Sequence, residues 1–491
     1  MRPYLLTTLS PALQVALLWS AICSAQSPPE NQSVPLATAR PNVLLILADD
    51  LGVNDLGCYG ADLHETPHID RLAQTGVRFL TAYSPAPVCT PTRASLLTGK
   101  HPARLGITIW SEGSKSGPQD RKLFQAESLH DLPHTEVTLA EKLQSAGWLC
   151  ASVGKWHLGD ADHAPETHGF DINIGGTHWG APQTFFWPYR GTGRFGSEFR
   201  YVPHLEFGKA GEYLTDRLTD ESIKVIDHAA EIHRPFFLLL GHHAPHTPIE
   251  AKSEHVSYFQ TKLKSTFHHR NATYAAMIRS LDESVGRLVA RLKSLNQLDN
   301  TIIIFTSDNG GYVGNDSSGN QITDNYPLKS GKGSLFEGGI RVPLIVNWPK
   351  SFPTASTRIA PVVLTDLFPT LLALTENSAD THQFDGVDLT AYLNDESKRP
   401  ARQSLMFHYP HYYHAPPTTP CGAIRHEDWK LIENFEDGKF ELFNLGSDPS
   451  ETNDLASQNP EKLSDLKSLL TKWRESVGAT MPRPNDAKLK L

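Results

Sequence analysis

The sequence is poor in cysteine and has no clustered positive charge. Only five of its 491 residues are cysteines, which is too few for a disulfide framework, and their spacing is not that of a zinc site. The 45 Lys and Arg residues are outnumbered by 54 Asp and Glu residues, which gives a net charge of -9. Because a nucleic-acid backbone is bound by clustered Lys and Arg, this composition excludes nucleic acid as a main partner.

The apolar stretch near the N-terminus is too short and too interrupted to span a bilayer as a mature helix. It runs over residues 12–23 and is followed by Ser24 and Ala25, which predicts a signal peptide over residues 1-25 and a linker over 26-40. Cys23 is a possible site for a lipoprotein anchor, but Ile22 before it is not a small residue, which argues against one. We therefore expect an exported protein, periplasmic, extracellular or lysosomal according to the organism, without a transmembrane segment.

Continuous apolar runs bounded by turn formers are the main structural signal in the rest of the chain. Such runs are typical of strands buried on both faces of a parallel sheet, and they occupy residues 43–48, 149–153, 236–240, 302–306 and 342–346. A helix with one apolar face is predicted over 273–295, and Thr138 with Glu141 forms a capping box for another. This alternation predicts an α/β domain over residues 41-385, with a large, mostly parallel or mixed sheet sandwiched by helices.

After residue 385 the pattern changes to short alternating segments separated by Gly and Asp turns. These segments cover residues 404–408, 422–425, 429–432 and 440–443, and a polar helix follows over 460–475. The pattern predicts a smaller antiparallel sheet with a closing helix over residues 386-491.

Acidic residues follow two of the predicted strands. Asp49 and Asp50 come directly after the first strand, and Asp308 and Asn309 come after the strand that ends near Thr306. Carboxylate and amide oxygens at one edge of a sheet are suited to calcium or magnesium rather than zinc. Each pair alone is equally compatible with a solvated turn.

The most informative segment is Cys89-Thr90-Pro91-Thr92-Arg93, followed by Ala-Ser-Leu-Leu-Thr-Gly. Pro91 and the residues after it predict a loop entering a short helix, with Cys89 at the helix N-terminus, where anions are favoured. Arg93 is placed to hold an oxyanion or to counter a carboxylate. The residues alone leave open whether the Cys89 thiol is a nucleophile or is inert.

This segment closely resembles the signature of the type I sulfatases, which belong to the alkaline phosphatase superfamily. Further segments resemble the family in order along residues 42–455. They lie at residues 43–56, 147–159, 235–248, 308–311, 331–343 and 441–449. The overall pattern is similar to arylsulfatase A and N-acetylgalactosamine-6-sulfatase relatives. The resemblance to the superfamily implies an alkaline phosphatase-like fold.

The resemblance also implies the chemistry of the site. Cys89 is expected to be oxidised to formylglycine by a formylglycine-generating enzyme, and the hydrated aldehyde, a gem-diol, attacks sulfur. One Ca²⁺ ion per chain is expected, with ligands Asp49, Asp50, Asp308, Asn309 and residue 89. The remaining catalytic residues implied are Arg93, Lys155 and Lys332, which balance negative charge, His246 as general acid, and His157, which takes the proton when sulfate is expelled. Neighbouring His242 and His243 have no match in the family pattern.

We therefore expect hydrolysis of a sulfate ester, on a sulfated carbohydrate or another sulfate ester substrate. One alternative is a phosphonate or phosphodiester hydrolase of the same fold, and another is an inactive relative that binds glycans. Three clusters of aromatic and basic residues are equally compatible with a sugar-binding cleft and with packing. They are His178-Trp179, Trp187 to Arg190, and His411 to His414.

Overall fold

The computed structural model describes residues 40–377 and 384–486. The predicted signal peptide, and the predicted linker up to residue 39, lie outside the described residues. From Arg40 onward the described residues form one compact unit. Within these residues no helix is both long and apolar enough to cross a membrane.

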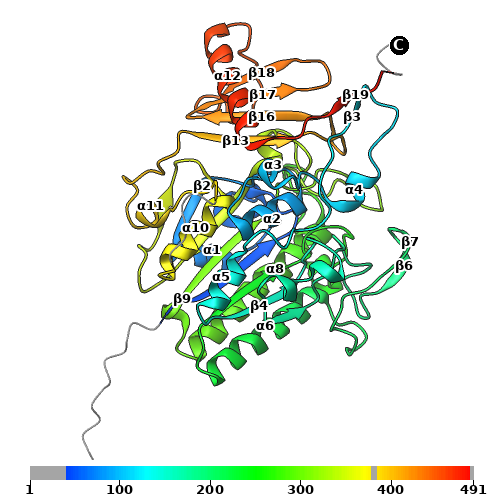
Figure 1. Ribbon diagram of the computed structural model, residues 1–491. Helices are drawn as coiled ribbons and strands as arrows, with labels where there is room; N and C mark the ends of the chain where they lie inside the picture. Colours follow the sequence, from blue (N-terminus) through cyan, green and yellow to red (C-terminus); the bar gives the residue numbers. More distant parts are fainter. Residues whose placement is uncertain (1–39, 378–383, 487–491) are drawn as a thin grey trace, which may run out of the picture. The chain divides into compact units, whose positions relative to one another are not determined.

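A sheet of nine strands forms the centre of this unit (Figure 1). Eight strands lie in the order β11-β2-β10-β9-β1-β8-β4-β5, and β12 pairs with β2 beside β11. The strand β10 is antiparallel to both of its neighbours, and all other pairs are parallel. The bounds are β1 Asn42–Ala48, β2 Val77–Tyr83, β4 Leu149–Gly154, β5 Ile172–Ile174, β8 Phe236–Gly241, β9 Thr301–Ser307, β10 Arg341–Asn347, β11 Ser356–Arg358 and β12 Val362–Val363.

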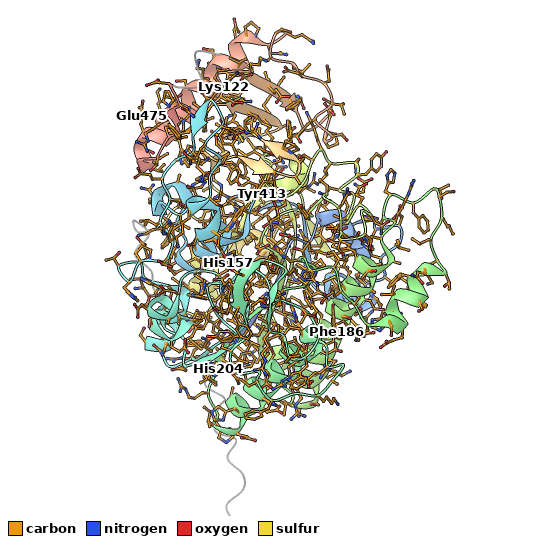
Figure 2. The ribbon with its side chains drawn as sticks, turned by 90° about the vertical axis from the view of Figure 1, so that its right-hand side faces the viewer. Lys122, His157, Phe186, His204, Tyr413 and Glu475 are labelled. Atoms are coloured by element: carbon orange, nitrogen blue, oxygen red, sulfur yellow. The ribbon has the colours of Figure 1, made fainter. Side chains whose placement is uncertain are left out.

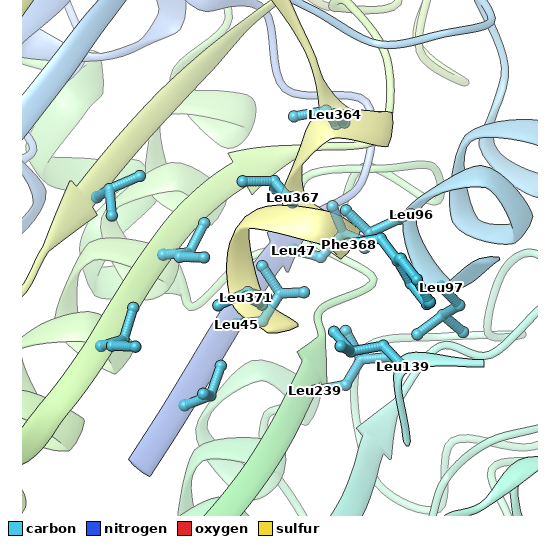
Figure 3. Packing of buried hydrophobic residues seen from close by; sticks show 14 of the residues in the cluster. Leu45, Leu47, Leu96, Leu97, Leu139, Leu239, Leu364, Leu367, Phe368 and Leu371 are labelled. Atoms are coloured by element: carbon cyan, nitrogen blue, oxygen red, sulfur yellow. The ribbon is translucent and has the colours of Figure 1, made fainter. Parts of the chain in front are cut away.

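Helices cover both faces of this sheet. In β1, Leu45 and Leu47 pack into one apolar cluster while Leu44 and Ile46 pack into another, because successive side chains of a strand point to opposite faces. The first cluster includes residues of α2 (Cys89–Thr98), α5 (Leu139–Ser145) and α10 (Leu367–Leu374) (Figure 3). It also includes residues of α11 (Thr390–Asn394). The second includes residues of α1 (Pro67–Gln74), α6 (Leu214–Glu231) and α8 (Ala272–Ser294).

The segment after residue 400 forms a separate antiparallel sheet in the order β13-β16-β17-β18. Its strands are β13 Ser404–Tyr409, β16 Cys421–His426, β17 Trp429–Asn434 and β18 Phe440–Asn444, and helix α12 (Pro460–Val477) packs on it through Leu466 and Leu470. The other face packs against residues of the large domain, among them Tyr83 and Leu335. Between the two parts, the Lys430 ammonium is buried between the carboxylates of Glu337 and Glu451, at 2.9 and 2.8 Å.

The predicted fold class is confirmed. Each of the five predicted central strands is present, α8 spans residues 272–294 against the predicted 273–295, and Thr138 and Glu141 form the predicted capping box. The four C-terminal strands and the closing helix also agree with the prediction. The apolar pattern did not predict β2 or the hairpin of β6 (Gly191–Gly193) and β7 (Gly196–Arg200), because these strands have few consecutive apolar residues.

Candidate active site

Four neighbouring parallel strands end at the same edge of the large sheet. The strands β4, β8, β1 and β9 lie side by side in this order, so the segments that follow them converge. Lys155 follows β4, Asp49 follows β1, Asp308 follows β9, and His246 lies in the segment after β8. The residues predicted from these four segments therefore come together.

Asp49 and Asp50 have different partners at the end of β1. The Lys155 ammonium donates to Asp49 Oδ2 at 2.7 Å, whereas the Lys332 Nζ lies 2.8 Å from Asp50 Oδ1. The amide of Asn309 donates to the same Asp50 oxygen at 2.8 Å. Asp50 has a φ of 64°, a left-handed conformation that is uncommon for a residue with a side chain. Its position is thus fixed by contacts from two other segments.

Cys89 is the first residue of α2, as predicted, and its side chain is buried. One turn further along this helix, Arg93 Nε donates to Asp308 Oδ2 at 2.9 Å, and Nη1 donates to the carbonyl of Lys155 at 2.8 Å. The sulfur of Cys89 and carboxylate oxygens of Asp49 and Asp308 all lie within 4.8 Å of one another. Burial raises the pKa of the Cys89 thiol, so the unmodified residue is not a thiolate nucleophile at neutral pH.

The donor atoms around Asp49 fit a divalent cation such as Ca²⁺. The carboxylates of Asp49, Asp50 and Asp308 and the amide of Asn309 are all buried. Among the described residues, Asp49 Oδ1 and Asn309 Oδ1 have no hydrogen-bond partner, which is unusual for buried oxygens. Burial raises the pKa of Asp49 to about 8, with Lys155 opposing this rise and Asp308 adding to it. An added positive charge would keep Asp49 ionised, and hard oxygen donors are the ligands that Ca²⁺ prefers.

His246 and His157 are both neutral in this environment. The Nδ1 of His246 is assigned as the protonated nitrogen because it lies 2.7 Å from the Thr247 carbonyl, which leaves Nε2 3.5 Å from Asp50 Oδ2. Burial and the Lys332 charge lower the pKa of His246 to about 3. Burial and the Lys155 charge lower the pKa of His157 well below its usual value, and its backbone adopts a φ of 60°.

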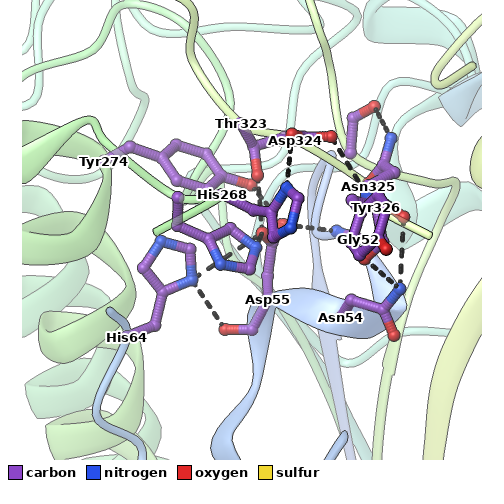
Figure 4. Close-up of polar contacts among 12 residues, drawn as sticks. Gly52, Asn54, Asp55, His64, His268, Tyr274, Thr323, Asp324, Asn325 and Tyr326 are labelled. Atoms are coloured by element: carbon purple, nitrogen blue, oxygen red, sulfur yellow. Dashed lines mark hydrogen bonds and ion pairs between the residues drawn. The ribbon is translucent and has the colours of Figure 1, made fainter. Parts of the chain in front are cut away.

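The turn after Asp50 rests on a buried polar network (Figure 4). The hydroxyl of Tyr274, in the first turn of α8, donates to Asp55 Oδ2 at 2.8 Å and lies 3.2 Å from the Asp50 carbonyl. Thr323 donates to the other oxygen of Asp55 at 2.6 Å, and His269 Nε2 lies 3.3 Å from that oxygen. These contacts join the Asp50 turn to a helix and to a loop that are remote in sequence.

A cavity of about 420 Å³ opens above these residues. Asp50, Cys89, His157, His246 and Lys332 contribute to its lining, and Tyr413 and His414 contribute from the C-terminal region. His157 and Tyr413 both lie in the central region of the molecule in Figure 2. The site residues predicted from the sequence are therefore grouped around one cavity. Asp49, Asp308 and Asn309 lie against residues that line it, and Lys155 and Arg93 contact Asp49 and Asp308 from behind.

Several residues singled out in the sequence have structural contacts elsewhere. His411 is buried with its Nε2 2.8 Å from the Thr108 hydroxyl, and the Tyr189 hydroxyl donates to Glu212. His242, which has no match in the family pattern, is buried against Ser284 at 3.0 Å. Among the cavity-lining residues that the sequence reasoning missed are Trp110, Glu112, Phe195, Arg200 and Tyr312. No motif surrounds them, so the sequence carried no signal that links them to the site.

Comparison with known proteins gives consistent matches over most of the described region. Residues 41–378 match the family model described as Sulfatase, and residues 331–476 match one described as N-sulphoglucosamine sulphohydrolase, C-terminal. The chain is 34% identical to N-acetylgalactosamine-6-sulfatase of Canis lupus familiaris over 72% of this chain and 66% of that protein, just under two thirds of its length. It is 31% identical to the Homo sapiens protein of the same name over 91% of this chain and 88% of that one. A crystal structure of Ps i-CgsB in complex with k-i-k-neocarrahexaose superposes with a TM-score of 0.74 and 32% identity, covering 89% of this chain and 93% of the other.

Proposed function

Because this chain belongs to the sulfatase family of sulfuric ester hydrolases, we propose that it hydrolyses a sulfate ester on a carbohydrate, using formylglycine made from Cys89 and one Ca²⁺ ion. The observation that carries the proposal is the position of Cys89, buried at the start of α2 within 4.8 Å of Asp49 and Asp308. A carbohydrate substrate is supported by the name of the N-acetylgalactosamine-6-sulfatase relatives and by the neocarrahexaose bound to Ps i-CgsB.

The proposed metal ligands are Asp49, Asp50, Asp308, Asn309 and residue 89. Three carboxylates in this set pair with three cations, Arg93, Lys155 and Lys332, so the side chains are close to neutral as a group. When bound, Ca²⁺ would polarise a sulfate oxygen and lower the pKa of the attacking hydroxyl group. The site with its metal then carries a net positive charge, which suits an anionic ester.

The modification of Cys89 would supply two hydroxyl groups, which a thiol lacks. A hydrated formylglycine carries two hydroxyl groups, one to attack sulfur and one to let sulfate leave. Its position at the N-terminus of a ten-residue helix favours an anion there. His157 is neutral, and its ring nitrogens have no hydrogen-bond partner within the described part of the chain. It is therefore available to take a proton when sulfate is expelled.

The remaining side chains of the site neutralise negative charge or donate a proton. We assign Lys155, Lys332 and Arg93 to balancing the charge that develops on the sulfate oxygens. His246 presents Nε2 toward Asp50 and the cavity, where the leaving alcohol needs a proton. Its ring is neutral without substrate, so the negative charge of a bound sulfate must raise its pKa before it acts as general acid.

The proposal includes maturation and location. We infer that a formylglycine-generating enzyme acts on the segment from Cys89 to Arg93, and that the chain is exported by its N-terminal signal. We also propose a catalytic domain over 41–385 and a C-terminal subdomain over 386–491.

The direct test is parallel hydrolysis of 4-nitrophenyl sulfate and an aryl phosphodiester by protein from a host that makes formylglycine. We expect sulfate ester hydrolysis that is lost in Cys89→Ala and on removal of Ca²⁺ by a chelator. Faster hydrolysis of the phosphodiester would favour the phosphorus ester alternative. Binding of sulfated sugars without release of sulfate from any ester would favour the inactive relative.

A further inference from the structure

The cavity lining contains two chemically different sets of residues. One set, here called the floor, includes charged residues of the proposed reaction, among them Asp50 and Lys332. The other set, here called the wall, consists of the aromatic rings of Trp110, Phe195, Tyr312 and Tyr413 with one acid, Glu112, and one base, Arg200. Neither the acid nor the base has a role in the reaction proposed above.

Glu112 has one carboxylate oxygen that is buried without a partner. It lies in the short helix α4 (Ser111–Lys115), and its side chain as a whole is 41% exposed. Nevertheless Oε2 is inaccessible to solvent, and among the described residues it has no hydrogen-bond partner. His157 Nε2 lies 4.0 Å from it, which is too long for a hydrogen bond. The carboxylate is thus incompletely hydrogen-bonded, and the exposed part of the side chain lies at the cavity, where a ligand can supply a donor.

Arg200 contacts the other carboxylate oxygen of Glu112, and its positive charge is shared with a second carboxylate. It is the last residue of β7 and is 8% exposed. Its Nη2 lies 3.5 Å from Glu112 Oε1, its Nε donates to Glu198 Oε2 at 3.1 Å, and its guanidinium lies 4.4 Å from the centre of the Phe195 ring. Two carboxylates therefore flank one guanidinium. The wall is therefore not a second anion site, in contrast to the floor, which would carry a net positive charge with the proposed metal bound.

We propose that Glu112 is a specificity-determining residue: its carboxylate accepts a hydrogen bond from a hydroxyl group of the sugar that bears the sulfate. This inference rests on the proposed function and names its substrate more closely. A hydroxyl donor suits this carboxylate, whereas a second sulfate or a carboxylate at that place meets a negative charge beside an Arg200 that Glu112 already shares with Glu198. The rings of Trp110 and Tyr413 provide apolar faces for the sugar. The preferred substrate is thus a sugar with one sulfate and a free hydroxyl group on the Glu112 side.

The test compares substrates rather than total activity. For the wild type, kcat/KM is measured on 4-nitrophenyl sulfate and on a panel of monosaccharide sulfates, and the best monosulfated sugar is paired with its disulfated counterparts. In Glu112→Ala we expect the ratio of kcat/KM on this sugar to kcat/KM on 4-nitrophenyl sulfate to fall at least tenfold. Glu112→Gln keeps the size of the side chain and an acceptor oxygen but loses the charge. In this variant we expect the ratio of kcat/KM on a disulfated sugar to kcat/KM on the monosulfated sugar to rise at least fivefold.

The matched control is Glu198→Ala, which removes the other carboxylate of Arg200 and does not contribute to the cavity lining among the residues described. We expect the ratio of kcat/KM on the monosulfated sugar to kcat/KM on 4-nitrophenyl sulfate in this variant to stay within twofold of the wild type. An equal loss of kcat/KM on every substrate in both Glu112 variants would overturn the inference, because it would mean that Glu112 acts through His157. Unchanged ratios in the two Glu112 variants would overturn it as well. Wild-type hydrolysis of 4-nitrophenyl sulfate but of no sugar sulfate would overturn the inference and leave sulfate ester hydrolysis standing, whereas hydrolysis of neither would refute the proposed function itself.

Discussion

At the scale of single residues, the proposed reaction needs two hydroxyl groups at position 89. A serine there supplies one hydroxyl group, so it can accept a sulfate group but has no second hydroxyl to expel it. We expect Cys89→Ser to turn over 4-nitrophenyl sulfate on the order of 10³-fold more slowly than the wild type or to stop after one turnover. Intact-mass measurement after incubation with substrate checks for retained sulfate. Sustained turnover at the wild-type rate would contradict the proposed role of the modified residue.

Lys332 and Lys329 provide a matched pair of substitutions. The Lys332 ammonium is buried and contacts Asp50, while Lys329 Nζ lies 3.8 Å from the Phe336 ring and outside the cavity lining, as far as the structure is described. We expect Lys332→Ala to lower kcat/KM on an aryl sulfate by roughly 10²-fold or more, because one cation that balances the sulfate is lost. Lys329→Ala should keep kcat/KM within about threefold of the wild type, because its half-buried ammonium contacts the Phe336 ring and not a residue of the cavity. Equal effects of the two substitutions would argue against an electrostatic role for Lys332.

Prediction from sequence at this scale depended on the kind of signal each residue carries. Asp49 and Asp308 were placed together by physical reasoning alone, because both follow buried strands of one parallel sheet. His246 and Lys332 were identified through family resemblance, since no periodicity distinguishes them from neighbouring His242 or Lys329. Glu112 was not identified, because the side chain reaches the cavity from a short helix with no pattern of its own.

At the scale of structural elements, α8 does more than cover the sheet. Its first turn places the Tyr274 hydroxyl between Asp55 and the carbonyl of Asp50, so it fixes the turn that carries two proposed metal ligands. Groups that orient metal ligands commonly change metal affinity by about 10–100-fold when they are removed. We therefore expect Tyr274→Phe to weaken Ca²⁺ binding by at least about tenfold, measured by calorimetric titration and by the rise of the melting temperature with added Ca²⁺.

The control for this substitution is Tyr258→Phe. Its hydroxyl group donates to Glu65 at the surface and is remote from the Asp50 turn in the hydrogen-bond network of the described residues. We expect this variant to bind Ca²⁺ as the wild type does. Loss of stability in Tyr274→Phe with no change in Ca²⁺ affinity would show that the hydroxyl group serves the fold alone.

Elements were predictable where a local pattern specifies them. The central strands and α8 follow from apolar runs and apolar periodicity, and Thr138 fixes the start of α5 by its cap. The direction of β10, antiparallel to both neighbours, is set by its long-range pairing with β9 and β2 and has no local signal. The hairpin that carries Arg200 is mostly exposed and rich in glycine, so its apolar content is too low to predict a strand.

At the scale of the whole molecule, buried histidines make stability depend on pH. Burial lowers the pKa of His64, His101 and His408 to about 4, and that of His242 and His411 to about 3. The usual value of 6.5 applies when the chain is unfolded. As the pH falls below about 6.5 the unfolded chain binds protons that the folded chain does not, so the free energy of unfolding decreases, by up to about 1.4 kcal/mol per pH unit for each such histidine.

His269 acts in the opposite sense. Burial alone would lower its pKa, but Asp55 and Asp62 raise it to about 9, so its contribution is present below pH 6.5 and is lost as the pH rises toward 9. We expect the melting temperature to fall steadily from pH 6.5 to pH 4, with a net uptake of protons on unfolding. In His411→Gln that uptake should decrease by up to one proton at pH 5. A melting temperature that is constant or rises over this range would contradict the account.

The central claim is that Cys89 becomes the nucleophile by modification, because the unmodified thiol is buried with a raised pKa. The most direct measurement is mass spectrometry of the tryptic peptide from Phe79 to Arg93, using protein from its native host. We predict that residue 89 carries an aldehyde, or its hydrate, in place of the thiol. An unmodified thiol in a preparation that hydrolyses sulfate esters would contradict the account.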